Sequence, residues 1–231
     1  MPPRLPKNTQ NRVSKRAPSK PQKRAASSAS QASSSPFDSS SPLYFWGHKN
    51  PQKAYLSQWY PCAFKDDVDS SIVYPTAEHY MMYHKALLFS DTAVAAQILT
   101  TSSPKAVKGL GRKVANFDDK VWAAHREDIV CRGNRLKFTN PADPDDEKWT
   151  VKAAGGKTLR ELLLETGDRE IVEASPFDRI WGIGFAGDKA EANRDRWGLN
   201  LLGKALMDVR RQLREEEAKV GVKEEGKKEA A

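Results

Sequence analysis

Residues 74–85 carry the side chains with the clearest capacity for chemistry, at an expected helix start. Pro75 prevents an earlier helix from running through, and Thr76 is a candidate N-cap. Glu78 then falls in the first turn, where unpaired backbone N–H groups favour a negative charge. Because Glu78 and Lys85 share one helix face, the stretch is either a capped surface helix or the floor of a site.

A second dense stretch lies late in the chain, where charged residues alternate with aromatic ones. Gly182 and another glycine two positions on permit tight turns and close approach of the backbone to a ligand. The third glycine of a dinucleotide-binding fingerprint is absent at the required spacing. Asp178 and Arg179 lie among apolar residues that include Trp181. This pattern indicates either a buried ion pair or an aromatic wall with a polar edge, which suits a stacked heterocycle.

Residue spacing argues against several other chemistries. His79 and His84 are five residues apart and do not share a helix face as a zinc-binding pair would. Ser57 and Ser175 lack the glycine-flanked elbow of a serine hydrolase, and no Walker A sequence occurs. The sequence therefore predicts no metal and no cofactor. Basic residues gather around two glycines at 105–113, where they indicate either a phosphate cradle or an exposed basic helix end.

The pattern of apolar residues predicts the elements that position these side chains. Strands are expected at 43–47, 71–74 and 171–173, the first two in a small N-terminal β-region. Helices are expected at 76–89, at 91–100, from 104 to 109 or 111, from 118 or 119 to about 133, from 157 or 158 to 165, and at 193–213. The last helix is predicted to face the core through Leu199, Leu201, Leu202, Leu206 and Val209. This order favours a predominantly α-helical α+β fold in a single domain.

Composition divides the 231-residue chain into one domain and two tails. Residues 1–36 carry eight of the 38 basic residues and no acid, so residues 1–42 are expected to be a disordered basic Ser/Pro-rich tail. Removing those eight leaves 30 basic against 30 acidic residues, so the net charge of +8 belongs to the tail. Residues 43–214 are expected to form the domain, and residues 215–231 a charged tail that frays into disorder.

The basic tail admits three interpretations. It is a flexible solvated arm, a nuclear import signal or nonspecific nucleic-acid arm, or a mitochondrial transit peptide. Six prolines argue against the amphipathic helix that a transit peptide needs. Because the basic character belongs to the tail, the net charge of the chain is only weak evidence that the domain itself grips a phosphate backbone.

Cysteine content and hydropathy bear on the compartment. Two cysteines without metal-type spacing favour a reducing, intracellular compartment, cytoplasmic or nuclear. Mitochondrial targeting by the tail stays open as an alternative. The chain has no run of about 18 apolar residues, so no membrane partner is expected.

Ordered blocks of the chain together resemble the NADAR family of YbiA-like proteins. The match covers residues 44–211 and rests on LSQW at 56–59, YPTAEHY at 74–80, KA at 85–86, GR at 111–112, IWGIG at 180–184 and WGLNLLGKALM at 197–207. The resemblance implies an N-glycosidase, which hydrolyses the C–N bond between a ribosyl group and a base. Family substrates include ribosylaminopyrimidine intermediates of riboflavin synthesis and ADP-ribosylated guanine. The expected partner is therefore a small nucleotide-like molecule.

The family pocket is lined by a Glu, a Trp and an Asp, and the resemblance implies roles for matching residues. Glu78 and Trp181 match the first two. Many bacterial members have the Asp two residues after the Trp, where this chain has Ile183, and Asp178 either takes over the role or the role is absent. Glu78 at a helix N-terminus is expected to stay ionised, as a charge stabiliser or water-positioning base.

The expected substrate-binding residues form a further set, which comprises Trp59, Lys85, Arg112, Arg179 and Gly182. Lys85 and Arg112 are the candidates for a substrate phosphate, although Arg112 also suits a helix-end cation. Trp181 offers a face for the base and equally suits the core.

Two other classes of function fit the sequence. The departure at Ile183 permits a non-catalytic module that binds ADP-ribose or an NAD-related nucleotide. The basic tail permits a nucleic-acid-associated protein that is tethered through residues 1–36, which would make its binding sensitive to salt.

Overall fold

The structure, a computed structural model, describes residues 41–146, 149–151 and 155–229. The predicted basic tail, with the alternatives for its role, lies outside the described residues except for its last two positions. Leu43, where order was predicted to begin, opens the first strand.

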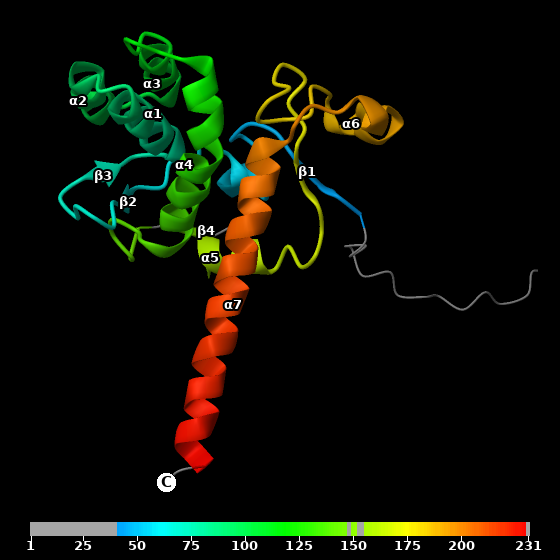
Figure 1. The fold of residues 1–231 in the computed structure, drawn as a ribbon. Helices are drawn as coiled ribbons and strands as arrows, with labels where there is room; N and C mark the ends of the chain where they lie inside the picture. The colour runs from blue at the N-terminus through cyan, green and yellow to red at the C-terminus, as the bar shows by residue number, and fades with distance from the viewer. Residues whose placement is uncertain (1–40, 147–148, 152–154, 230–231) are drawn as a thin grey trace, which may run out of the picture. The chain divides into compact units, whose positions relative to one another are not determined.

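The described residues are mainly helical, which confirms the predominantly α-helical α+β fold. Four helices follow one another in the chain, namely α1 (Ala77–Leu88), α2 (Thr92–Thr100), α3 (Pro104–Gly111) and α4 (Asp119–Thr139). α1 packs against the other three (Figure 1). The starts of α2, α3 and α4 agree with the predicted ones because Asp91, Ser103 and Asp118 each accept a hydrogen bond from a backbone N–H of the first turn.

The cap of α1 differs from the prediction. Thr76 occupies the N-cap position, but its side chain accepts no bond from the first turn. Its hydroxyl lies 2.7 Å from Nδ1 of His79 instead. The N–H of Glu78 donates to the carbonyl of Gln58 at 3.0 Å, so a segment outside the helix satisfies this part of the helix start.

The strands form three two-stranded sheets in the described part of the chain. β1 (Leu43–Phe45) pairs in parallel with β6 (Ile171–Glu173), while the antiparallel pairs are β2 (Phe64–Lys65) with β3 (Val73–Tyr74) and β4 (Thr150–Val151) with β5 (Lys157–Thr158). The strand predicted at 71–74 is present as β3, whereas the strand predicted at 43–47 is present as β1 but pairs with β6 rather than within an N-terminal β-region. Parallel strands need a long crossover connection, and here the helices α1 to α5 supply it.

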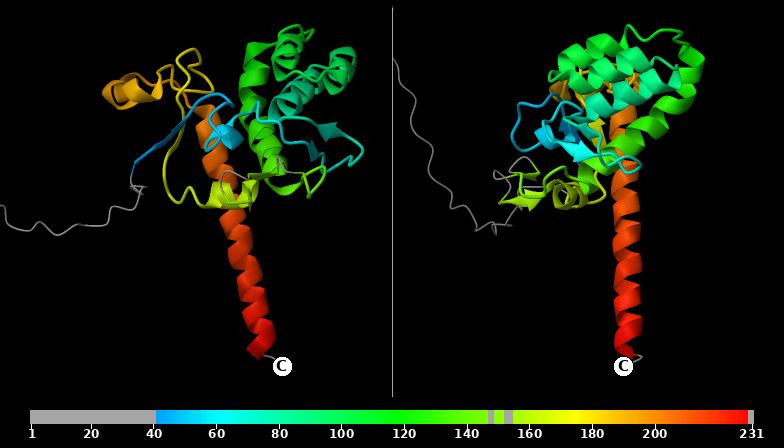
Figure 2. Two further views of the ribbon diagram at one scale, coloured as in Figure 1. Left: turned by 180° about the vertical axis from the view of Figure 1, so that it is seen from behind. Right: turned by 90° about the vertical axis from the view of Figure 1, so that its left-hand side faces the viewer.

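Three helices and two 3₁₀ turns complete the described elements: α5 (Leu159–Leu164), α6 (Gly187–Ala190), α7 (Leu201–Glu229), Ala54–Leu56 and Glu191–Arg196. α7 contacts α4, α5 and β6 along its N-terminal part (Figure 1). Its C-terminal part runs on beyond the other elements in both views of Figure 2. The main core cluster joins β1, α1, α4, α5 and α7. Among the described residues, no helix is both long and apolar enough to cross a lipid bilayer.

The last helix begins later and ends later than predicted. Leu199 is 48% exposed, so its predicted core position is wrong. Its N–H donates to the carbonyl of Arg179, which holds the segment before α7 as a connection rather than a helix. The helix then continues to Glu229, through the segment that was expected to fray. Ion pairs from Arg135 and Arg160 to Glu216 support this extension, and Glu and Lys favour helix.

The packing of α7 on β6 leaves no room for a side chain at Gly203. A Cβ at Gly203 would lie 2.1 Å from the carbonyl oxygen of Ile171, whereas one at Gly109 in α3 would meet nothing within 4 Å. We expect Gly203→Ala to lower the free energy of unfolding by about 2–4 kcal/mol, because backbone must shift. Gly109→Ala should leave it unchanged or raise it by up to about 1 kcal/mol. Urea unfolding measures both, and equal effects would contradict this account of the α7–β6 contact.

Candidate active site

Glu78 lies at the centre of a buried polar cluster. Its side chain is 3% exposed, and its carboxylate accepts a hydrogen bond from the side chain of Trp59. The other carboxylate oxygen, Oε1, has no hydrogen-bond partner in the described part of the chain. Such unpaired buried atoms are rare in folded proteins and indicate a place for water or a ligand.

Burial raises the pKa of the Glu78 carboxyl to about 7. The charge of Lys108 opposes this shift, and so do the hydrogen bond from Trp59 and the charge of Arg112, while Asp178 adds to it. The pKa of Glu78 is thus higher than its place at a helix N-terminus predicts, so the ionised form predominates only above about pH 7. The penalty for placing a charge in a dry site exceeds the stabilisation that the helix start provides.

Glu173, at the end of β6, is a second carboxyl in this cluster. Burial raises its pKa to about 8, and the charges of Asp178 and Glu78 raise it further, while Lys108 lowers it. Its Oε2 atom is buried and has no hydrogen-bond partner among the described residues. Glu78 and Glu173 are thus two carboxyls whose pKa values are both raised above the ordinary value, chiefly by burial.

Asn200, the residue immediately before α7, positions Glu173. Asn200 is buried, and its side-chain oxygen accepts a hydrogen bond from the N–H of Glu173 at 3.0 Å. Its amide nitrogen donates to the carbonyl of Ile171 at 2.9 Å. One side chain therefore ties the start of α7 to the strand that carries the second carboxyl.

Asp178 and Trp181 are brought to the same cluster by the loop after β6. Asp178 Oδ1 accepts hydrogen bonds from the N–H groups of Ile180 at 2.9 Å and Trp181 at 2.8 Å, which makes a tight local turn. The charge of Asp178 raises the pKa of both glutamates. Trp181 is half-buried and packs against the main core cluster.

A buried lysine anchors the segment that carries Trp59. Lys137 of α4 is fully buried, and its ammonium donates to the carbonyls of Tyr55 at 2.5 Å and Ser57 at 2.8 Å. Burial lowers the pKa of Lys137 to about 8. The carbonyl of Gln58 then receives the N–H of Glu78, so α4 indirectly fixes the start of α1.

Three of the predicted substrate-binding residues, namely Lys85, Arg179 and Gly182, make contacts that support the fold. Lys85 donates to the carbonyl of Gly111 at 2.8 Å, and its ammonium lies 4.0 Å from the ring centroid of Phe117. Arg179 makes no ion pair with Asp178 in the described part of the chain, and its guanidinium donates to the carbonyl of Arg196. Of the two interpretations of this stretch, the buried ion pair is therefore not the one found among the described residues.

Gly182 likewise serves packing. A Cβ there would lie 2.6 Å from the carbonyl oxygen of Glu173, so the loop can lie against β6 only without a side chain. Gly182 thereby sets the distance between the strand that bears Glu173 and the turn that bears Trp181.

Sequence reasoning missed two charged residues of this cluster. Glu173 was expected only as part of a strand. The available signal for a role in the site was that this acidic residue ends the strand and directly precedes the aromatic stretch. Lys108 was one of several lysines in the basic stretch, but its charge acts on both glutamates. Within the described residues, no group of three His, Cys, Asp or Glu side chains is placed to hold a metal ion.

Known proteins resemble this chain over most of the described part. A family model described as NADAR domain matches residues 44–214. "N-glycosidase R617" of Acanthamoeba polyphaga mimivirus is 42% identical over 174 residues, which cover 73% of this chain and 94% of that protein. "N-glycosidase YbiA" of Escherichia coli K12 is 31% identical over 140 residues, which cover 61% of this chain and 71% of that protein. The NMR structure of the E. coli protein YbiA matches with a TM-score of 0.57 at 26% identity, over 77% of this chain and 88% of that one.

The raised pKa of Glu78 predicts a pH-dependent effect on stability. A carboxyl whose folded pKa is raised stabilises the fold below its ordinary pKa, and this contribution is lost as pH rises through about 7. Glu78→Gln should therefore raise the free energy of unfolding at pH 8 by roughly 1–3 kcal/mol and have a smaller effect at pH 5. Urea unfolding at both pH values measures this.

Glu127→Gln, on the exposed surface of α4, is the control and should change little at either pH. An equal effect of Glu78→Gln at pH 5 and pH 8 would contradict the raised pKa.

Proposed function

The chain belongs to the NADAR family and is an N-glycosidase, and we propose that Glu78 and Glu173 divide the work of breaking the N-glycosidic bond. The observation that carries this proposal is the pair of buried carboxyls with unpaired oxygens and different pKa values. Two carboxyls whose environments separate their pKa values suit an acid and a base in one reaction.

The reaction needs a proton for the departing base and a negative charge beside the sugar. As the C–N bond breaks, its electron pair leaves with the base, and positive charge develops on the ribosyl ring. Protonated Glu173 donates a proton to the base. Ionised Glu78 stabilises the charged sugar and then takes a proton from the water that attacks it. A proton returning from Glu78 to Glu173, directly or through solvent, restores the starting state.

Neighbouring residues support these roles. The hydrogen bond from Trp59 orients the Glu78 carboxylate and favours its ionised form. The charge of Asp178 raises the pKa of Glu173, which keeps the acid protonated, and its turn holds Trp181 beside the cluster. We assign Asp178 this supporting role in place of the family Asp that is absent at Ile183.

Lys108 and Arg112, both at the C-terminal part of α3, are the proposed contacts of the substrate's phosphate. Their charges act on Glu78, which places them near the cluster. Lys108 makes no ion pair with a described carboxylate, so its ammonium is available to an anion. This favours a phosphoribosyl or ADP-ribosyl substrate, such as a ribosylaminopyrimidine phosphate or ADP-ribosylated guanine.

Replacing either glutamate tests the division of roles. We expect Glu78→Gln and Glu173→Gln each to lower kcat by about 10²–10⁴, because each removes a proton-transfer group. Release of free base from a ribosylaminopyrimidine phosphate and from ADP-ribosylated guanine measures the rate. Glu127→Gln should retain full activity. Near-normal turnover by folded Glu78→Gln protein would refute its role.

The pH profile distinguishes the two roles. The rate should fall below about pH 7 as Glu78 takes up a proton and above about pH 8 as Glu173 loses one. In Glu173→Gln protein the alkaline fall should disappear while the acid fall remains.

A pair of lysine substitutions on α3 tests the phosphate contact. Lys108→Met should raise KM for a phosphorylated substrate by roughly 10- to 100-fold, because a charge-assisted hydrogen bond is lost. Its effect on the dephosphorylated nucleoside should be much smaller. Lys105→Met, an exposed position on the same helix, is the matched control and should change neither KM. Equal effects on both substrates would argue against a phosphate contact at Lys108.

A further inference from the structure

Two aromatic side chains stand exposed beside one another near the carboxyl cluster. Trp46 is 53% exposed and Phe177 is 86% exposed. Their ring centroids are 6.0 Å apart and the rings are tilted by 56°. Leaving large aromatic side chains in water is unfavourable, because their burial would stabilise the fold. Two neighbouring exposed aromatic side chains therefore indicate a binding role.

The positions of the two residues follow from the parallel β1–β6 pair. Trp46 comes directly after β1, and Phe177 lies in the loop after β6. Parallel strands present their carboxyl ends at one edge, so both aromatic residues leave the sheet at the edge where Glu173 ends β6. Phe177 is also the chain neighbour of Asp178, whose charge acts on both glutamates.

The loop after β6 holds Phe177 outward by its own hydrogen bonds. The hydroxyl oxygen of Ser175 accepts a hydrogen bond from the N–H of Phe177 at 3.4 Å. Oδ1 of Asp178 accepts hydrogen bonds from the N–H groups of Ile180 and Trp181. The backbone is therefore fixed on both sides of the exposed ring. A preorganised ring loses little entropy when a ligand binds.

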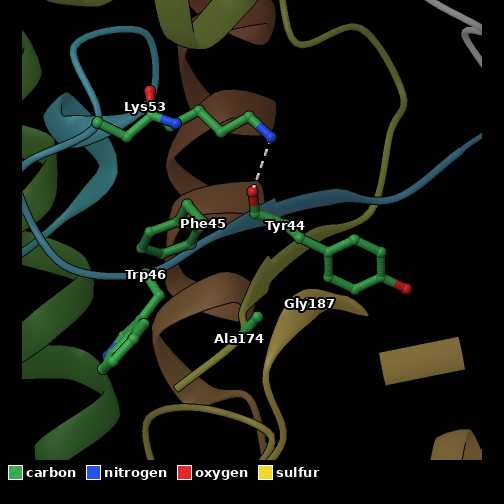
Figure 3. A pocket seen from close by; sticks show the side chains of 7 residues that line it. Tyr44, Phe45, Trp46, Lys53, Ala174 and Gly187 are labelled. Carbon is green, nitrogen blue, oxygen red and sulfur yellow. Dashed lines mark hydrogen bonds between the residues drawn. The ribbon is translucent and has the colours of Figure 1, made fainter. Parts of the chain in front are cut away.

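Trp46 also lines a shallow pocket on the surface of β1 (Figure 3). The pocket has a volume of about 150 Å³ and is further lined by Tyr44, Phe45, Asn50, Lys53, Ala174 and Gly187. Pockets for whole small-molecule ligands are typically about 300–1,000 Å³, so this one accommodates part of a ligand. In Figure 3, the side chains of Tyr44 and Trp46 point to different sides, and Ala174 lies between them.

We propose that Trp46 and Phe177 form a stacking subsite for the aromatic base of the N-glycoside, next to the carboxyls that cleave its bond to ribose. The proposal rests on the proposed function, because the acid that protonates the base must lie beside it. An exposed indole binds a flat heterocycle through its ring face, and this interaction tolerates different bases. The subsite therefore selects for a ring rather than for a particular base.

Two ligands that differ only in the ring test this subsite. GMP and ribose 5-phosphate are titrated by calorimetry into Glu78→Gln protein, which removes turnover. Adding Trp46→Ala or Phe177→Ala should weaken GMP binding by about tenfold and leave ribose 5-phosphate binding within about twofold. Trp46→Phe and Phe177→Tyr keep a ring and should retain most of the GMP affinity, whereas Phe177→Leu should lose it.

Val68→Ala, at an 81% exposed apolar position, is the control for a general surface effect and should change neither affinity. The proposal is overturned if GMP binds no more tightly than ribose 5-phosphate, or if the ring-removing variants weaken both ligands equally. Hydrolysis by the unsubstituted protein is measured separately, so failure of the stacking subsite is distinguished from failure of the N-glycosidase mechanism. Because both rings are exposed, circular dichroism should show an unchanged fold in every variant.

Discussion

The site depends on one constraint, which is that the Glu78 carboxyl is held out of water at the start of a helix. Burial raises its pKa, while Lys108 and the Trp59 side chain keep the ionised form accessible. The same residue also closes the helix start, because its N–H donates to Gln58. Lys137 donates to the carbonyls of Tyr55 and Ser57 in the same segment, so hydrogen bonds connect α4, residues 55–58 and α1.

The second requirement is a parallel pair of short strands that joins distant parts of the chain. β1 and β6 bring the residues after Phe45 and after Glu173 to one edge. Asn200 and Gly203 then lock α7 against β6, through two hydrogen bonds and a close backbone contact. The packing of α7 on β6 therefore determines where the second carboxyl lies.

The buried carboxyls have a cost in stability. Glu78 and Glu173 each keep an oxygen without a partner among the described residues, and their ionised forms oppose burial. Lys85, by contrast, is engaged through its hydrogen bond to the carbonyl of Gly111 and its contact with the ring of Phe117. This contrast separates the functional charges from the structural ones, because a charge that only supports the fold is normally paired.

Sequence alone determined the features that depend on neighbouring residues. The capping side chains of Asp91 and Ser103 and the apolar periodicity are local, so the helix starts and the place of Glu78 in a first turn were predictable. The ordered motifs also identified the family. Three features became evident only from the tertiary structure. Glu78 is buried with a raised pKa, Lys85 contributes to packing, and Glu173 lies in the site. Burial and charge interactions between residues far apart in sequence arise only when the strands and helices assemble, so no local pattern encodes them.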